Sequence, residues 1–164
     1  MTQAVSDTGP LLHLTEASRL WLLERIGDTH APPQVIAEMA ALLRDWQLPA
    51  WLTVDDLEPS RSVEAVAWVQ AGFLHAGEAE AVALAQQISA DWLLTDDAAA
   101  RLFATQLGIE VHGSLGIVLW AAVNGFLDQD AAERALLALA SSSLWISRSV
   151  LAEARSALGE IFRR

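Results

Sequence analysis

Short apolar segments alternate with longer segments of helical periodicity from one end of the sequence to the other. The short segments are bounded by polar residues, Gly or Pro, which is typical of strands buried inside a protein. We expect strands at residues 2–6, 28–33, 91–95 and 109–113, and a strand or extended edge at 51–57.

In the longer segments, apolar residues recur every three or four positions, as they do on the buried face of a helix. Pro33 suits the first turn of one such helix, and Gly108 suits the end of another. We expect helices at residues 8–14, 16–26, 33–43, 60–72, 77–90, 97–108, 114–125, 128–142 and 147–162.

This alternation predicts an α/β fold in which helices flank a central parallel sheet. The length of 164 residues fits one domain, which we place at residues 1–164. In such sheets, ligands bind beyond the carboxyl ends of the strands. Asp7 follows the first strand, and Asp96 and Asp97 follow the strand at 91–95. We therefore expect these three carboxylates to reach one crevice.

The apolar content is high, with 53% hydrophobic residues and a mean hydropathy of +0.31. No apolar run approaches the ~18 residues that a membrane span needs, and no basic start precedes an apolar stretch as in a signal peptide. We expect no contact with a membrane. Cys is absent, which excludes disulfides and thiolate metal sites and favours a cytoplasmic location.

The formal net charge is −11, and all ten basic residues are Arg. So acidic a chain is not suited to holding nucleic acid on a broad basic face. Any contact with RNA or DNA must be local, assisted by a metal ion, or completed by a partner. The absence of Lys excludes P-loop chemistry, Schiff bases and the Lys of phosphate-accepting receiver domains.

Further acids lie on two of the predicted helices. Glu38 falls on the flank of the apolar face of its helix, roughly 95° from the centre of that face. Glu78 and Glu80 lie on opposite flanks of the next helix but one, roughly 160° apart. Only one of these two is expected to line the crevice, and the sequence leaves open which one.

Several carboxylates gathered in one crevice cannot all remain ionised unless a cation compensates their charge. Mg²⁺ and Mn²⁺ prefer oxygen ligands, whereas a site without Cys is less typical of Zn²⁺. The sequence therefore points to Mg²⁺ or Mn²⁺, with metal ligands drawn from six acids: Asp7, Glu38, Glu78, Glu80, Asp96 and Asp97.

With these acids in this order, the sequence resembles the PIN domain family, the metal-dependent ribonucleases that include VapC-type toxins. It is most similar to a PIN-like branch that carries a GEAEA segment. The resemblance covers nearly the whole chain and rests on five segments: VSDTGPLLHL, PPQVIAEM, GEAEAVALA, LLTDDAAAR and GIEVHGSLGIVLWAAVNGF. It implies a three-layer α/β/α fold, here with extra C-terminal helices.

The resemblance also implies a set of catalytic residues. Asp7 matches the aspartate after the first strand, and Glu38 matches the acid of the second helix. Glu80 matches the acid that opens the family's D-A-x-I-A-A run, and Asp97 matches the acid two positions after the Thr that ends a strand. Asp96 remains an alternative to its neighbour. At Glu80 the sequence departs from the family's pattern, because Glu is one methylene longer than the commoner Asp.

Other residues are expected to support this site. Thr8 and Thr95 would orient the carboxylates. Arg101 lies one helical turn after the Asp pair, where it would form an ion pair within its helix or contact a phosphate or partner. All four His are expected to be structural. Most of the seven Trp are expected in the core. The exceptions nearest loops are Trp46, Trp51 and Trp145, for which an exposed interaction patch is the alternative to the core.

The function implied is an Mg²⁺- or Mn²⁺-dependent endoribonuclease that hydrolyses phosphodiester bonds of single-stranded RNA. If the protein is a toxin, an antitoxin would be its partner, and a homodimer would help an acidic chain to hold an anionic substrate. The alternative is a catalytically silent PIN-like module that binds another protein.

Overall fold

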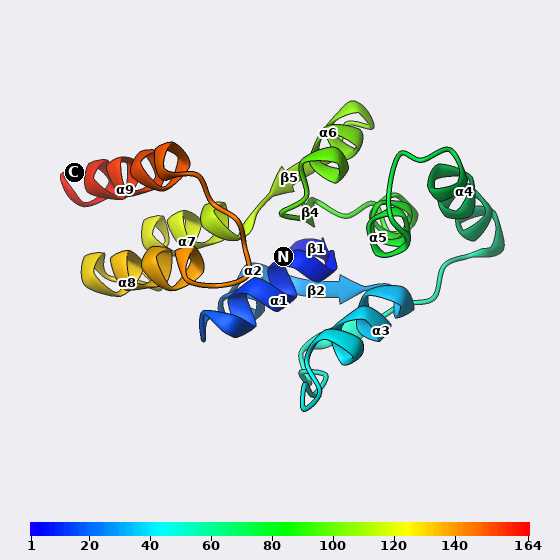
Figure 1. Cartoon of the computed structure of the whole chain (residues 1–164), viewed down its shortest axis with the longest axis horizontal. Helices are drawn as coiled ribbons and strands as arrows, with labels where there is room; N and C mark the ends of the chain where they lie inside the picture. The colour runs from blue at the N-terminus through cyan, green and yellow to red at the C-terminus, as the bar shows by residue number, and fades with distance from the viewer.

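The computed structural model describes residues 1–164 and has a central sheet of five parallel strands (Figure 1). In spatial order the strands are β3 (Leu52–Val54), β2 (Gly27–Ala31), β1 (Thr2–Ser6), β4 (Trp92–Leu94) and β5 (Glu110–His112). Val5 of the central strand lies opposite His30 on one side and Leu93 on the other. The sheet is therefore doubly wound, with its first strand in the middle.

Nine helices accompany the sheet. They are α1 (Thr8–Glu16), α2 (Leu22–Ile26), α3 (Pro33–Leu42), α4 (Pro59–Gln70), α5 (Ala76–Gln87), α6 (Ala98–Gln106), α7 (Ser114–Val123), α8 (Gln129–Ala140) and α9 (Arg148–Phe162). Asp128 and Ser147 cap α8 and α9 by accepting backbone hydrogen bonds, as their places in the sequence predict.

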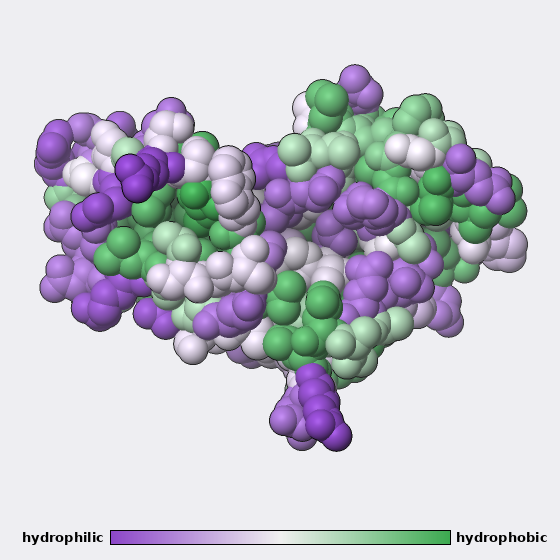
Figure 2. Space-filling model, in the orientation of Figure 1, coloured by the Kyte–Doolittle hydropathy of each residue, from purple (hydrophilic) through white to green (hydrophobic).

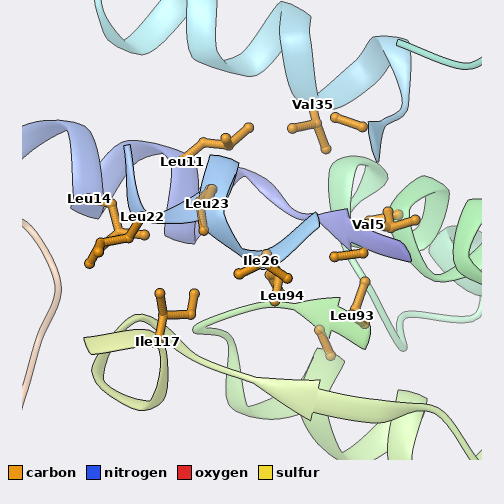
Figure 3. Packing of buried hydrophobic residues seen from close by; sticks show 14 of the residues in the cluster. Val5, Leu11, Leu14, Leu22, Leu23, Ile26, Val35, Leu93, Leu94 and Ile117 are labelled. Carbon is orange, nitrogen blue, oxygen red and sulfur yellow. The ribbon is translucent and has the colours of Figure 1, made fainter. Parts of the chain in front are cut away.

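The helices form two outer layers, so the three-layer α/β/α architecture is confirmed. α1 and α2 pack against α7, and α8 and α9 extend this group away from the sheet. α5 packs against β1 and β4 between α4 and α6. The core is mainly Leu, Ala and Val, and Figure 3 shows Leu14 and Leu22 of α1 and α2 close to Ile117 of α7.

The structure differs from the sequence prediction between residues 8 and 26. The first helix runs on to Glu16, and the helix expected at 16–26 is reduced to α2. Ser18 separates the two with a positive φ of 57°, and the backbone amide of Arg19 donates to the carbonyl of Leu14. The apolar residues keep a helical spacing across this turn, so periodicity alone could not reveal it. None of the helices combines the length and the hydrophobicity that spanning a bilayer requires.

Candidate functional site

The carboxyl ends of β1 and β4, which are neighbours in the sheet, open into a pocket of about 250 Å³. This is the position where strand order reverses, since β2 lies on one side of β1 and β4 on the other. The pocket is lined by Asp7, Thr8, Gly9, His13, Glu38, His75, Glu78, Asp96, Asp97, Ser143, Leu144 and Trp145. We call it the acidic pocket.

Asp7 lies at the centre of this arrangement, directly after β1 and at the N-cap of α1. Its side chain is 5% exposed. Oδ1 accepts a hydrogen bond of 2.7 Å from the backbone amide of Thr8, and Oδ2 accepts one of 2.9 Å from the hydroxyl of Thr95. The carboxylate is therefore held in one orientation by groups from two different strand ends.

The pKa of Asp7 is raised to about 7, chiefly by burial, and the negative charges of Glu78 and Glu38 act in the same direction. The hydrogen bonds from Thr8 and Thr95 lower this pKa but do not outweigh the loss of hydration. A cation beside Asp7 would favour the ionised form, because it would compensate the charge that burial and the neighbouring acids disfavour.

Glu38 and Glu78 reach the pocket from two helices that meet at the start of α5. Glu38 accepts hydrogen bonds from the Thr8 hydroxyl and, at 3.1 Å, from the backbone amide of Gly77. A Cβ on Gly77 would lie 2.7 Å from Cδ of Glu38, so only Gly allows this approach. Glu78 accepts a hydrogen bond from the backbone amide of His75 and so closes a capping box at the start of α5.

Glu80 does not line the acidic pocket. It lines a separate, smaller pocket between α4 and α5, together with Val66 and Val69. Its pKa is raised first by burial and then by the charge of Glu38, while the backbone amide of Gln34 lowers it. The two opposite flanks expected for Glu78 and Glu80 therefore face two different pockets, and the acid on the side of Asp7 is Glu78.

Asp96 and Asp97 are neighbours with different partners. Asp96 accepts hydrogen bonds from the backbone amide and hydroxyl of Ser114, both at 2.6 Å, and from Nδ1 of His13 at 2.7 Å. Asp97 caps α6 through Oδ1, which accepts from the backbone amide of Ala100, and its Oδ2 accepts no hydrogen bond. Asp96 is thus fully engaged by the protein, whereas Asp97 keeps one oxygen available.

His13 is a site residue that the sequence analysis assigned to a structural role. It follows Gly9 by one helical turn, and both lie on the side of α1 that meets Asp96: Cβ of Asp96 would lie 3.4 Å from a Cβ on Gly9. The sequence does hold a signal for His13. Gly9 and His13 are four positions apart on a helix that is otherwise largely apolar, so they share one face of it.

A second, larger pocket adjoins the first. It has a volume of about 480 Å³, lies between α7 and α9, and shares Asp96, Leu144 and Trp145 with the acidic pocket. Arg101 lines it and forms no ion pair, so the intrahelical ion pair considered for this residue is not formed.

No three Asp, Glu or His side chains converge closely enough to hold a metal ion as they lie. The chemistry of the donors nevertheless fits a hard divalent cation, because all candidate ligands are carboxylate oxygens. Mg²⁺ commonly keeps several waters and takes one or two protein carboxylates. Asp7 and the available oxygen of Asp97 supply such a pair in the acidic pocket.

Comparison with known proteins agrees with this architecture. A search among curated proteins finds no match. A family model described as PIN domain matches residues 3–160, which is nearly the whole chain and includes every acid of the pocket. The chain therefore belongs to the PIN domain family.

Proposed function

We propose that this protein is a metal-dependent ribonuclease that hydrolyses phosphodiester bonds in single-stranded RNA with Mg²⁺ or Mn²⁺. Membership of the PIN domain family, whose fold is of nuclease type, supports the reaction class. The observation that carries the proposal is the buried Asp7, whose pKa is raised to about 7 in a pocket shared with Glu38, Glu78 and Asp97.

The proposed metal ligands are Asp7, the available oxygen of Asp97, and Glu78, which must turn away from its contacts with His75 to reach the ion. A divalent cation bound there supplies charge stabilisation for the phosphate and lowers the pKa of water. Glu38 adds negative charge beside Asp7 and, through its hydrogen bonds to Thr8 and to the start of α5, fixes how the helices carrying the acids meet. Glu80 is left out of this set because it lines another pocket.

Two further side chains hold the acids in place. The hydroxyl of Thr95 donates to Asp7 and also accepts from the backbone amide of Asp97, so one side chain links two of the proposed ligands. Asp96 ties the start of α7 to His13 of α1 and thereby closes one wall of the pocket. Its role in the proposal is structural support of the site.

A toxin role, with an antitoxin as partner, is a finer proposal on the same site. A dense group of carboxylates would attract a basic side chain of an inhibitor, because the opposite charge relieves their repulsion. A homodimer is proposed on the ground that an acidic chain gains from a second copy when it holds an anionic substrate.

The test is cleavage of a single-stranded RNA oligomer with Mn²⁺, combined with calorimetric titration of Mn²⁺. We expect cleavage by the wild type, loss in EDTA, and loss of both cleavage and Mn²⁺ binding in Asp7→Asn and Glu78→Gln. Glu80→Gln is the matched control and is expected to retain both. Cleavage that persists in EDTA would refute the proposal.

The same titration separates the enzyme from a catalytically silent binding module. The absence of three convergent metal-binding groups is the observation that favours this second candidate. A silent module takes up no Mn²⁺ at a specific site and cleaves no RNA, with or without the metal.

A further inference from the structure

The pocket between α7 and α9 is continuous with the acidic pocket. The two share Asp96, Leu144 and Trp145, so the residues that end one pocket begin the other. Figure 1 shows the connection between α8 and α9 returning from the outer helices toward α1 and the sheet. In Figure 2 hydrophilic residues gather in the hollow between the α7–α9 group and the group of α4 to α6.

Trp145 lies on the shared wall and is 85% exposed. The loop that carries it is tied down, because Ser143 donates to Oε1 of Glu16 from its hydroxyl at 2.5 Å and from its backbone amide at 3.3 Å. The backbone amide of Leu144 donates to Ser142 as well. The indole is thus held at this place without contributing buried area to the core.

The remaining walls combine apolar side chains with two charges of opposite sign. Leu115, Leu119 and Val150 supply apolar surface. Arg101 brings a guanidinium beside Gly113, on the same side as Asp96, and Glu153 brings a carboxylate from α9; neither forms an ion pair. The indole of Trp145 can stack on a base, and the guanidinium of Arg101 can contact a phosphate. The carboxylate of Glu153 can accept hydrogen bonds from the amino group of a base.

We propose that this groove binds the nucleotide next to the cleaved phosphodiester bond, with its base stacked on Trp145 and its phosphate contacting Arg101. The inference rests on the proposed ribonuclease function and assigns that function a base-binding site. The volume of about 480 Å³ lies within the usual range of ligand pockets. Only unpaired bases can be stacked in this way, so the site selects single-stranded RNA.

The test uses nucleoside 5′-monophosphates, which contain no phosphodiester bond to cleave, and the NMR signal of the Trp145 indole N–H. This signal is identified by its loss in Trp145→Phe. We expect it to shift on titration with adenosine, cytidine, guanosine and uridine monophosphates, and to stay in place with ribose 5-phosphate. A larger response to bases that carry an amino group than to uracil would follow from Glu153.

Variants then measure the contribution of each contact by calorimetric titration. Trp145→Ala is expected to weaken binding of the monophosphates about 5- to 150-fold, the range observed when an aromatic partner of a base is removed. Trp145→Phe keeps a ring face and is expected to retain most of the affinity. Trp21→Ala, which removes a partly exposed Trp lining neither pocket, is the matched control and leaves binding unchanged.

The outcomes separate this inference from the proposed function. If RNA is cleaved but the Trp145 signal does not respond to any nucleotide, the base-binding site is refuted, the nuclease stands, and a protein segment becomes the better occupant of the groove. If nucleotides shift the Trp145 signal but no metal supports cleavage, the nuclease is refuted and the base-binding site stands. When the nuclease and the base-binding site are both confirmed, Trp145→Ala is expected to raise KM for RNA.

Discussion

In the protein without a bound metal ion, two features of the surroundings of Asp7 disfavour its ionised form. Its position at the end of β1 buries it, and its neighbours Glu38 and Glu78 are also acids. In the folded state its pKa is about 7, whereas its ordinary value is 3.8. Between these two pH values the folded protein holds a proton that the unfolded chain has released, so folding is linked to pH at this one residue.

The linkage predicts that Asp7 lowers stability as the pH rises from about 4 to about 7, because the folded state binds more protons than the unfolded state in this window. Above pH 7 the loss in the free energy of unfolding caused by the buried charge of Asp7 is fully present. Asn carries no charge at this position, so in EDTA at pH 8 Asp7→Asn is expected to be more stable than the wild type. The gain has an upper bound of about 4 kcal/mol, from about 1.4 kcal/mol per pKa unit.

Urea unfolding at pH 5 and pH 8 measures this difference. The advantage of Asp7→Asn over the wild type is expected to be larger at pH 8. Asp45→Asn, at an exposed position outside the pocket, is the control and should show no such change with pH. Equal stability of Asp7→Asn and the wild type at both pH values would show that burial of this carboxylate carries no cost.

Part of the site could be foreseen from single residues. The acids at strand ends follow from the rule that ligands bind at the carboxyl ends of parallel strands, and Asp7, Asp96 and Asp97 all line the acidic pocket. The choice between Glu78 and Glu80 could not be made, because a helical wheel gives two flanks and not the neighbours of each. His13 was missed as a pocket residue for the same reason: its partner, Asp96, is distant in the sequence. Trp145 was expected only as part of an exposed interaction patch, and its place on the wall of the acidic pocket was not foreseen.

The start of α5 shows how one helix positions several groups of the site. Gly77 lets the carboxylate of Glu38 approach its backbone amide, and the following residue, Glu78, closes the capping box. α5 is buried along most of its length between α3, α4 and the sheet. The acids of α3 and α5 are therefore held by tightly packed backbone.

Gly77→Ala is expected to disturb the site without any change in its charges. The new Cβ would meet the carboxylate of Glu38, so this side chain must move and give up its hydrogen bond to residue 77. We expect a loss of about 1–3 kcal/mol in the free energy of unfolding, typical of overpacking, together with weaker Mn²⁺ binding. Thermal unfolding and calorimetric titration measure these two effects.

Gly159→Ala in α9 is the matched control. A Cβ there meets no atom within 4 Å, and Ala favours a helix over Gly by about 1 kcal/mol. This variant should be as stable as the wild type or more so. If Gly77→Ala behaves in the same way, the close contact with Glu38 does not constrain the site.

The elements themselves were largely predictable, because buried parallel strands and amphipathic helices leave clear patterns in the sequence. The break between α1 and α2 was not, since Ser18 adopts a positive φ that favours Gly and the apolar spacing continues through it. The order of the strands in the sheet could not be predicted from the hydrophobic pattern either. Periodicity shows that a segment is a strand but not which strands pair.

The charge of the molecule limits how it can hold RNA. The net charge is −11, and Arg101 is the only basic residue lining the pocket between α7 and α9 other than His112. RNA affinity should therefore depend on few phosphate contacts. The affinity of nucleic acid for a protein falls with salt according to the number of phosphates that basic residues neutralise.

We expect a shallow salt dependence, with a slope of about −0.7 in a plot of log affinity against log salt, which corresponds to one phosphate of a single strand. In Arg101→Ala the slope should approach zero. Fluorescence anisotropy with a labelled RNA oligomer measures the slope with and without Arg101→Ala. Both proteins also carry Asp7→Asn, which prevents cleavage of the RNA. Arg44→Ala, outside both pockets, is the control. A slope several times steeper would reveal a basic contact surface other than this groove.

The place of β1 in the sheet has a consequence for the newly made chain. β1 leaves the ribosome before its neighbour β4, because β4 is formed by Trp92–Leu94, far later in the sequence. Until then one edge of β1 has no pairing strand, and Asp7 lacks both Thr95 and Asp97. Unfinished chains that stop before β4 thus cannot assemble the pocket, and any hydrolytic activity of the protein begins only after β4 and Asp97 have been synthesised.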